Sequence, residues 1–182
     1  MAYEILSSEY INKHIYFTAR KDSYVLPDGK IVDPYFVVEL PTSVVAMAIT
    51  EKNEVLMVKQ YRHPVQEELL ELPGGFIDPG EQPMQSVERE LLEETGYSFD
   101  SFQYLGSTAA NPGVLNNVTH LFIALGGKKV SEQQLDHNEA IDVLLKPLEE
   151  VRNLLRHSEI KQSMHALCLF YGFAYLDEHP LD

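Results

Sequence analysis

The sequence predicts an α/β protein in which a mixed β-sheet lies between helices and a small β extension precedes it. Two observations predict this fold class. Apolar runs of strand length lie on both sides of a segment with helical periodicity, and the first run of the main sheet is almost continuously apolar. Hydrophobic residues make up 45% and charged residues 23% of the 182 residues, which suits one globular domain with a modest extension and excludes a disordered chain.

The N-terminal part of the chain favours short strands. Residues 3–40 combine β-branched and aromatic runs with turn signals, and the Leu-Pro-Asp-Gly-Lys segment at residues 26–30 is typical of a hairpin turn. We therefore expect residues 1–41 to form the β extension and residues 42–182 to form the main domain.

The main sheet is expected to begin with two strands. Residues 43–49 and 55–61 flank a polar turn at residues 51–54. Because the first of these runs is nearly all apolar, both of its faces should be covered by helices.

A helix is predicted over residues 83–95. Its first residue is proline, Gly96 suits the position just past its end, and Met84, Val87 and Leu91 recur at helical spacing and should pack on the sheet. The remaining elements are expected as strands at residues 104–107, 118–125 and 140–145 and as helices near residues 148–155 and from about residue 158. The last helix carries an apolar stripe that is more typical of a core or a subunit interface than of a cofactor site: Ile160, Met164, Leu167, Cys168, Tyr171 and Tyr175.

The charge balance limits the partners of the protein. Lys and Arg number 14 against 28 Asp and Glu, which gives a formal net charge of −14. Such a surface repels polyanions, so nucleic-acid and membrane-surface partners are not expected. A phosphate ligand would have to be bound by a few placed arginines, backbone N–H groups or divalent cations.

The chain is expected to be cytoplasmic. Its single cysteine, Cys168, cannot form an internal disulfide, which fits a reducing compartment. The first residues show no secretory signal, and the longest apolar stretch, residues 166–176, is shorter than the ~20 residues that span a bilayer.

Three carboxylates share one face of the predicted helix. At ~100° per residue, Glu90 and Glu94 lie ~40° apart and Glu93 lies ~60° to the other side of Glu90. Most glutamate runs are solvated helix faces, yet acids at these spacings repel each other and gain nothing in water. A bound Mg²⁺ or Mn²⁺ would reverse that balance, because hard cations take several oxygen ligands.

This segment resembles the complete signature of the Nudix hydrolases. Its positions are Gly75, Glu81, Arg89-Glu90-Leu91, Glu93-Glu94 and Gly96-Tyr97. The resemblance implies an α/β/α sandwich and the metal-dependent hydrolysis of a nucleoside diphosphate linked to another group. The implied cofactor is Mg²⁺ or Mn²⁺, which would screen the diphosphate and activate the water that attacks phosphorus.

The resemblance also implies a role for each matching residue. Glu90 and Glu94 would be the main metal ligands, with a carbonyl ligand from Gly74. Glu93 would be a further ligand or the catalytic base that orients the attacking water.

A supporting pair is implied behind these ligands. Arg89, pointing away from the metal, would pair with Glu81 and fix the glycine loop to the helix.

Flanking residues resemble the ADP-ribose pyrophosphatases and related nucleoside-diphosphate-sugar pyrophosphatases. The similar segments are residues 60–65, Gln-Tyr-Arg-His-Pro-Val, and residues 71–75, Glu-Leu-Pro-Gly-Gly. Pro112, which falls 16 residues beyond Gly96, matches a marker of the ADP-ribose subgroup. The alternative is that it is an ordinary loop proline. The reaction implied is ADP-ribose plus water giving AMP and ribose 5-phosphate.

Arg62 is the best candidate for a substrate-binding residue that holds a phosphate, since a guanidinium stays charged and forms paired hydrogen bonds. The alternative is a surface ion pair with Glu67 or Glu68.

The subgroup implies a catalytic base from a loop outside the helix. Glu139 is the first choice, with Asp136 and Glu132 as rivals. His137 and His120 are weaker candidates, because magnesium prefers oxygen to imidazole.

The N-terminal extension resembles the part of ADP-ribose pyrophosphatases that helps to form a homodimer. Tyr35 or Phe36 is a candidate to stack on the substrate base, and the alternative is that both pack in the interface as strand residues.

Two other functions stay open. One is a GDP-mannose or other nucleoside-diphosphate-sugar pyrophosphatase. The other is a non-catalytic module that senses a nucleotide, against which the complete motif and the negative charge argue.

Overall fold

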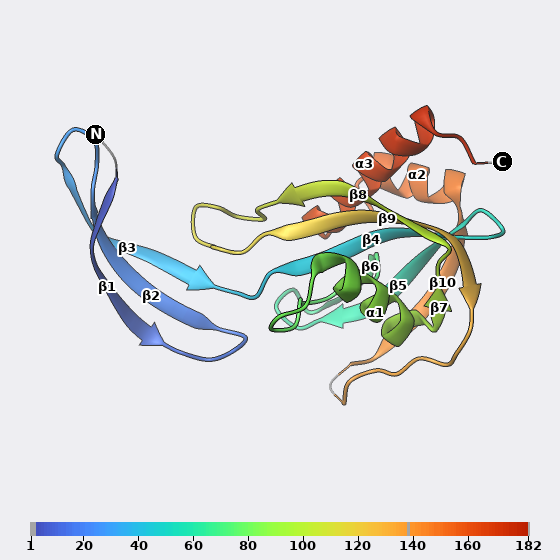
Figure 1. The fold of residues 1–182 in the computed structure, drawn as a ribbon, viewed down its shortest axis with the longest axis horizontal. Coiled ribbons are helices and arrows are strands. Elements are labelled where there is room, and N and C mark those ends of the chain that lie inside the picture. Colours follow the sequence, from blue (N-terminus) through green and yellow to red (C-terminus); the bar gives the residue numbers. More distant parts are fainter. Residues whose placement is uncertain (1–2, 138, 182) are drawn as a thin grey trace. The chain divides into compact units, whose positions relative to one another are not determined.

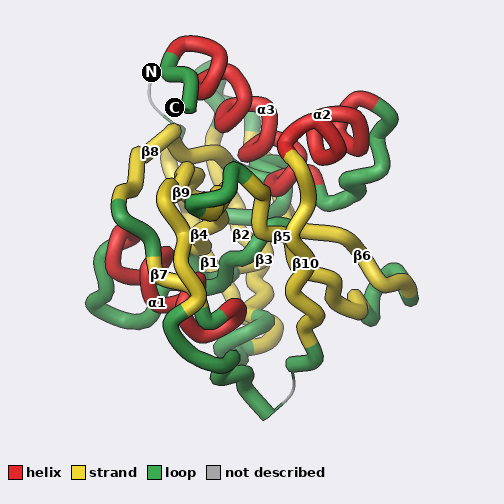
Figure 2. The backbone as a smooth tube through the Cα atoms, turned by 90° about the vertical axis from the view of Figure 1, so that its right-hand side faces the viewer, coloured by secondary structure: helices red, strands yellow, loops and turns green. Residues whose placement is uncertain are grey.

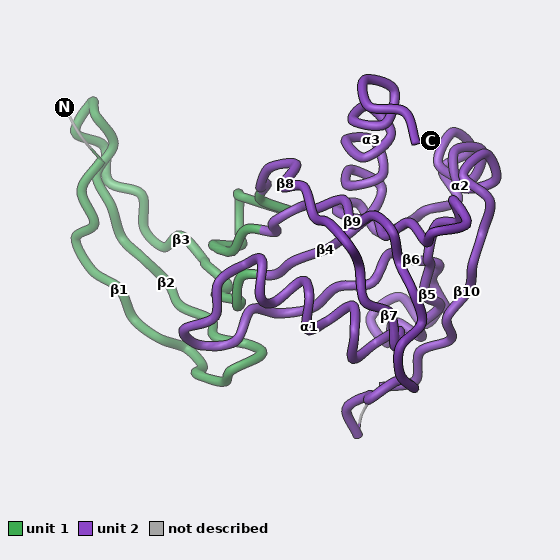
Figure 3. Tube along the Cα trace, turned by 45° about the vertical axis from the view of Figure 1, so that its right-hand side comes forward, with its two compact units in different colours: residues 1–42, 109–118 green, residues 43–108, 119–182 purple. Residues whose placement is uncertain are grey.

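The computed structural model describes residues 3–137 and 139–181. The chain divides into two compact units, residues 1–42 with 109–118 and residues 43–108 with 119–182 (Figure 3). The loop 109–118, which the sequence analysis assigned to the main domain, belongs to the first unit because it bonds to the third strand. Val38 N donates to Val114 O at 2.8 Å and Asn116 N donates to Val38 O at 3.3 Å.

The first unit is built on a three-stranded antiparallel sheet in the order β1-β2-β3 (Figure 1). Its strands are β1 (Glu4–Asn12), β2 (Thr18–Val25) and β3 (Ile31–Glu39). The predicted turn at residues 26–30 joins β2 to β3, with Leu26 N donating to Lys30 O at 2.8 Å. Every residue of β1 is exposed, so this strand has no cover within its own unit.

The second unit contains a seven-stranded mixed sheet. Its strands are β4 (Ser43–Thr50), β5 (Glu54–Arg62), β6 (Glu67–Glu71), β7 (Tyr97–Ser98), β8 (Ser101–Thr108), β9 (Thr119–Lys129) and β10 (Ile141–Pro147). The order is β10-β5-β4-β9-β7, with β6 paired to β5 and β8 paired to β9. Only the β4–β9 pair is parallel among the pairs of this sheet, which makes the sheet mixed as predicted.

Helices cover both faces of this sheet. Figures 1 and 2 show α1 (Pro83–Thr95) on one side and α2 (Leu148–Arg156) with α3 (Ser163–Glu178) on the other. The alternation of side chains along β4 divides the core between the two sides. Val44, Ala46 and Ala48 pack with residues of α1, whereas Val45, Met47 and Ile49 pack with α2 and α3. The α/β/α sandwich is therefore confirmed.

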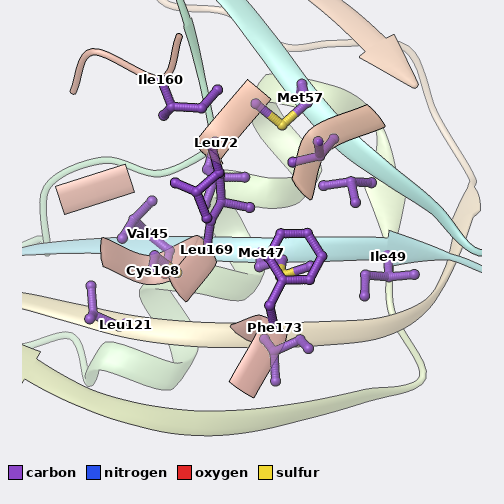
Figure 4. Packing of buried hydrophobic residues seen from close by; sticks show 14 of the residues in the cluster. Val45, Met47, Ile49, Met57, Leu72, Leu121, Ile160, Cys168, Leu169 and Phe173 are labelled. Atoms are coloured by element: carbon purple, nitrogen blue, oxygen red, sulfur yellow. Dashed lines mark hydrogen bonds between the residues drawn. The ribbon is translucent and has the colours of Figure 1, made fainter. Parts of the chain in front are cut away.

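The larger part of the core lies under α3. Figure 4 shows Leu169 and Phe173 of α3 against Met47 and Val45 of β4. Burial of apolar surface in this packing contributes ~25 cal/mol per Å² to stability. The close packing also holds the sheet rigid, and α1 lies on the opposite face of that sheet.

Three local expectations were wrong. Strand β6 was missed, because Glu-Glu-Leu-Leu-Glu has little β-propensity and is held by its pairing with β5. Helix α3 begins at Ser163 rather than near residue 158, since Ser158 adopts φ 59° and the Gln162 side chain caps Met164 N at 2.6 Å. Met84 remains 37% exposed although Val87 and Leu91 are buried.

No helix within residues 3–137 and 139–181 is long and apolar enough to cross a membrane.

Candidate active site

A glycine loop leads from β6 towards α1 along the edge of β4. Ala46 N donates to Pro73 O at 3.1 Å, and Val44 N donates to Gly75 O at 2.9 Å. Because the carbonyls on either side of Gly74 face β4, the Gly74 carbonyl faces away from that strand. A Cβ atom at Gly74 would lie 2.3 Å from Val44 O, so only glycine permits this close approach.

Glu94 of α1 reaches this loop. Its Oε2 accepts a hydrogen bond from Gly74 N at 2.9 Å, and the residue is only 6% exposed. Burial raises the pKa of Glu94 to about 8, although the Gly74 N–H group opposes the shift; the charges of Glu90 and Glu139 add to it. A buried carboxylate with so little compensation is well suited to a cation ligand.

Glu90, one turn earlier, lies against the next glycine. A Cβ atom on Gly75 would be 2.4 Å from Glu90 Oε1, so a side chain at that position would displace the carboxylate. Burial raises the pKa of Glu90 to about 7; the neighbouring Arg89 opposes the rise, and the charges of Glu93 and Glu139 add to it.

Arg89 joins the loop to the helix. Its Nε and Nη2 donate to the two oxygens of Glu81, both at 3.0 Å, and these bonds lower the pKa of Glu81 to about 2. Nη2 also donates to Phe76 O at 3.1 Å.

The same guanidinium does not point away from the acidic face, contrary to the expectation. Arg89 Nη1 donates to Glu90 Oε1 at 2.9 Å and to Glu93 Oε2 at 3.0 Å. The reason is geometric, because Glu90 is adjacent in sequence and Glu93 is one turn further on, within reach of a long side chain.

The residues present fit a divalent cation in chemistry. Within residues 3–137 and 139–181, no group of three or more acidic, His or Cys side chains is gathered tightly enough to hold a metal ion as it stands. Glu90 and Glu93 each direct one carboxylate oxygen to Arg89. The donors on offer are all oxygens, namely the carboxylates of Glu90, Glu93 and Glu94 and the carbonyl of Gly74, and Mg²⁺ and Mn²⁺ prefer such donors.

Arg62, at the end of β5, binds neither of its expected alternative partners. Glu67 pairs with Lys161 and Glu68 pairs with Lys59. Arg62 instead pairs with Glu71, a partner that the sequence analysis did not foresee. The signal was the place of this acid, directly before the buried Leu-Pro and the glycine loop.

Glu139 lies close enough to the acidic face for its charge to act on both Glu90 and Glu94. Its Oε2 accepts from Asp136 N at 3.0 Å, which folds the side chain over its own turn. Of its rivals, Glu132 is paired with Lys129 at 3.3 Å and Asp136 is exposed.

Two candidate substrate-binding residues of the first unit, Tyr35 and Pro112, lie close together. Tyr35 Oη donates to Gly113 O at 2.6 Å, next to the exposed Pro112. The Tyr35 ring also meets Tyr24 edge-on, with ring centroids 5.7 Å apart. Phe36 is 56% exposed.

The chain is similar to known proteins along most of its length. Residues 39–168 match the family model described as NUDIX domain, and residues 3–38 match the model described as nucleoside diphosphate sugar hydrolase N-terminal domain.

Two curated relatives span most of the chain. A methanol dehydrogenase activator from Bacillus methanolicus is 34% identical over 151 residues, which cover 82% of this chain and 81% of the relative. An ADP-ribose pyrophosphatase from Bacillus subtilis is 31% identical over 147 residues, which cover 80% and 79%. A crystal structure of an ADP compounds hydrolase superposes with a TM-score of 0.86 at 20% identity, over 99% of this chain and 97% of that one, and this likeness concerns the fold.

Proposed function

The chain belongs to the Nudix hydrolase family, and on that premise we propose that it hydrolyses ADP-ribose, or a related ADP-sugar, to AMP and a sugar phosphate. With ADP-ribose the second product is ribose 5-phosphate. The observation that carries the proposal is the pair of carboxylates, the partly buried Glu90 and the buried Glu94, set against the glycine loop at Gly74 and Gly75. The name of the Bacillus subtilis relative supports the choice of substrate.

The metal site we propose consists of Glu90, Glu94 and the Gly74 carbonyl, with Glu93 as a further ligand or as the residue that orients the attacking water. A bound Mg²⁺ or Mn²⁺ would neutralise the diphosphate and make the attacking water more acidic. A chain with a net charge of −14 needs such compensation to hold a substrate of the same sign.

Other residues would transfer the proton, bind the substrate phosphate and position the glycine loop. Glu139 takes the proton of the water whose oxygen attacks phosphorus, and the bridging P–O bond breaks on the opposite side, so that one phosphate leaves with each product. Arg62 holds a phosphate oxygen of the substrate. Arg89 and Glu81 keep the glycine loop against α1.

For the base of the substrate, we propose stacking on Phe36 or Tyr35, with Pro112 in the same unit bordering the ligand. The exposed ring of Phe36 supports this choice, whereas Tyr35 already bonds to Gly113.

We further propose a homodimer formed through the first unit and a cytoplasmic location. The exposed edge strand β1 supports the dimer. Cys168 is buried and forms no disulfide, which suits a reducing compartment.

A substrate panel tests the proposal. ADP-ribose, ADP-glucose and GDP-mannose are incubated separately with the protein and Mg²⁺, and the products are identified by mass spectrometry. We expect the highest kcat/KM with ADP-ribose and the products AMP and ribose 5-phosphate. A preference for GDP-mannose would assign the chain to the alternative substrate, and tight binding without turnover would indicate a sensing module.

A further inference from the structure

Glu71, the last residue of β6, is a buried acid to which the catalytic scheme assigns no role. Its side chain is 1% exposed. Burial of an unpaired carboxylate is strongly unfavourable, so the fold must supply a partner.

That partner is Arg62. Its Nε donates to Glu71 Oε1 at 3.0 Å and its Nη2 donates to Glu71 Oε2 at 2.6 Å. Both carboxylate oxygens are engaged, so one edge of the planar guanidinium is fixed in position and in angle.

The sheet register directs this pair towards the acidic site. Val58 lies opposite Glu71 and Arg62 lies opposite Glu67, so both paired side chains leave the sheet on the face of Val58. Val58 packs in the core that α1 covers, and α1 carries the acidic face.

His165 of α3 lies on the other side of Glu71 without competing for it. Its Nδ1 accepts a hydrogen bond from Leu72 N at 3.0 Å and lies 3.7 Å from Glu71 Oε2. Burial lowers the pKa of His165 to about 4, so the imidazole is neutral at physiological pH. Arg62 therefore supplies all the hydrogen bonds that the described residues give to this carboxylate.

The Nη1 group of Arg62 is not used in the pairing with Glu71. The side chain is 42% exposed, and Nη1 has no acceptor among the described residues. The hydrogen bonds to Glu71 raise the pKa of Arg62, and the charges of Glu71, Glu94 and Glu139 add to that rise, which places the guanidinium within electrostatic reach of both site acids.

Stability alone does not account for such a pair. Replacing a buried ion pair by apolar residues is often neutral or stabilising, so its presence is better explained by the geometry it imposes. An exposed pair on the same two strands, Lys59 with Glu68, provides the contrast.

We infer that Glu71 is a positioning residue for substrate binding: it holds Arg62 by the Nε–Nη2 edge and so presents the remaining N–H groups to a phosphate oxygen of the diphosphate. This inference rests on the proposed function, which supplies the diphosphate.

A double-mutant cycle tests it. In Glu71→Gln the amide nitrogen opposes the guanidinium, so one of the two bonds is lost while shape and burial are kept. We expect KM for ADP-ribose to rise about tenfold with kcat changed less than about threefold, and Arg62→Ala to raise KM at least as much. In the Arg62→Ala background, Glu71→Gln should change KM by less than about twofold.

The matched control is Glu68→Gln, which removes the exposed acid on the same strand and should leave KM within about twofold of the wild type. An equal effect of Glu71→Gln in both backgrounds, or none in the wild-type background, overturns the inference. Should Glu71→Gln fail to fold, Arg62→Lys replaces it, since lysine keeps the charge but cannot form the paired hydrogen bonds to Glu71. An unchanged KM in Arg62→Lys would then overturn the inference.

A binding measurement separates the two proposals. Calorimetric titration with a non-hydrolysable α,β-methylene analogue of ADP-ribose and Mg²⁺ is made on the same variants. If the wild type neither hydrolyses ADP-ribose nor binds the analogue, both proposals fail. If it does either one and the cycle shows no coupling between Arg62 and Glu71, the inference fails alone.

Discussion

Glu90 and Glu94 are carboxylates that the fold buries at the expense of its own stability. In the absence of a cation, burial raises their pKa values to about 7 and about 8. A group whose pKa is higher in the folded than in the unfolded protein binds more protons when folded, so the free energy of unfolding falls as the pH rises between the two values. Such acids favour function over stability.

The metal-free protein should therefore lose stability between pH 6.5 and 8. Below that window His165 works in the opposite sense, because its pKa in the folded protein is lowered to about 4. In EDTA we expect the unfolding free energy to drop by about 1–2 kcal/mol from pH 6.5 to pH 8, and Glu94→Gln should remove most of the drop while abolishing hydrolysis.

Denaturant unfolding at the two pH values measures this effect. Glu88→Gln, an exposed position of the same helix, is the control and should behave as the wild type. Equal pH dependence in Glu94→Gln and in the wild type would show that the carboxylate is not the source.

At the scale of single residues, the sequence predicted which acids face together but not how they are held. Glu90, Glu93 and Glu94 follow from helical spacing alone. The contacts of Arg89 to Glu90 and Glu93, and the pairing of Arg62 with Glu71, depend on side-chain rotamers and on a strand register that no local pattern encodes.

At the scale of elements, strong local signals were sufficient and weak ones were not. The helix over residues 83–95 was predicted to its end residues, because proline at its start and a left-handed glycine after it are unambiguous, and Gly96 adopts φ 75°. Strand β6 could not be predicted, since its pairing with β5 is a tertiary interaction that overrides the propensity of a glutamate-rich segment.

Strand β1 is the element on which the proposed dimer depends. It exposes Ile5 at 65% and Ile11 at 58%, and strands of this kind pair or pack with another chain. The variant Ile5→Lys with Ile11→Lys should shift the protein from dimer to monomer in sedimentation equilibrium. Val130→Lys, which alters an exposed apolar residue of the second unit, should remain dimeric. A monomeric wild type would contradict the proposed dimer.

At the scale of the whole molecule, the fold class followed from the hydrophobic patterning of the sequence. The apolar strand at residues 43–49 predicted a sheet covered on both faces, and the two halves of the core confirm it. The assignment of residues 109–118 to the first unit was not predictable, because it rests on backbone bonds to Val38 across a long sequence separation.

The net charge links this architecture to its chemistry. At a net charge of −14, divalent cations placed between the acids and the phosphates would offset the repulsion of a diphosphate, which agrees with the proposed metal site.

The most direct test of this account is a Mn²⁺ titration followed by electron paramagnetic resonance. The wild type should bind Mn²⁺, and Glu90→Gln and Glu94→Gln should each weaken binding by at least about tenfold, whereas Glu88→Gln should leave it unchanged. Equal Mn²⁺ affinity in all four proteins would contradict the claim that these two carboxylates hold the catalytic cation.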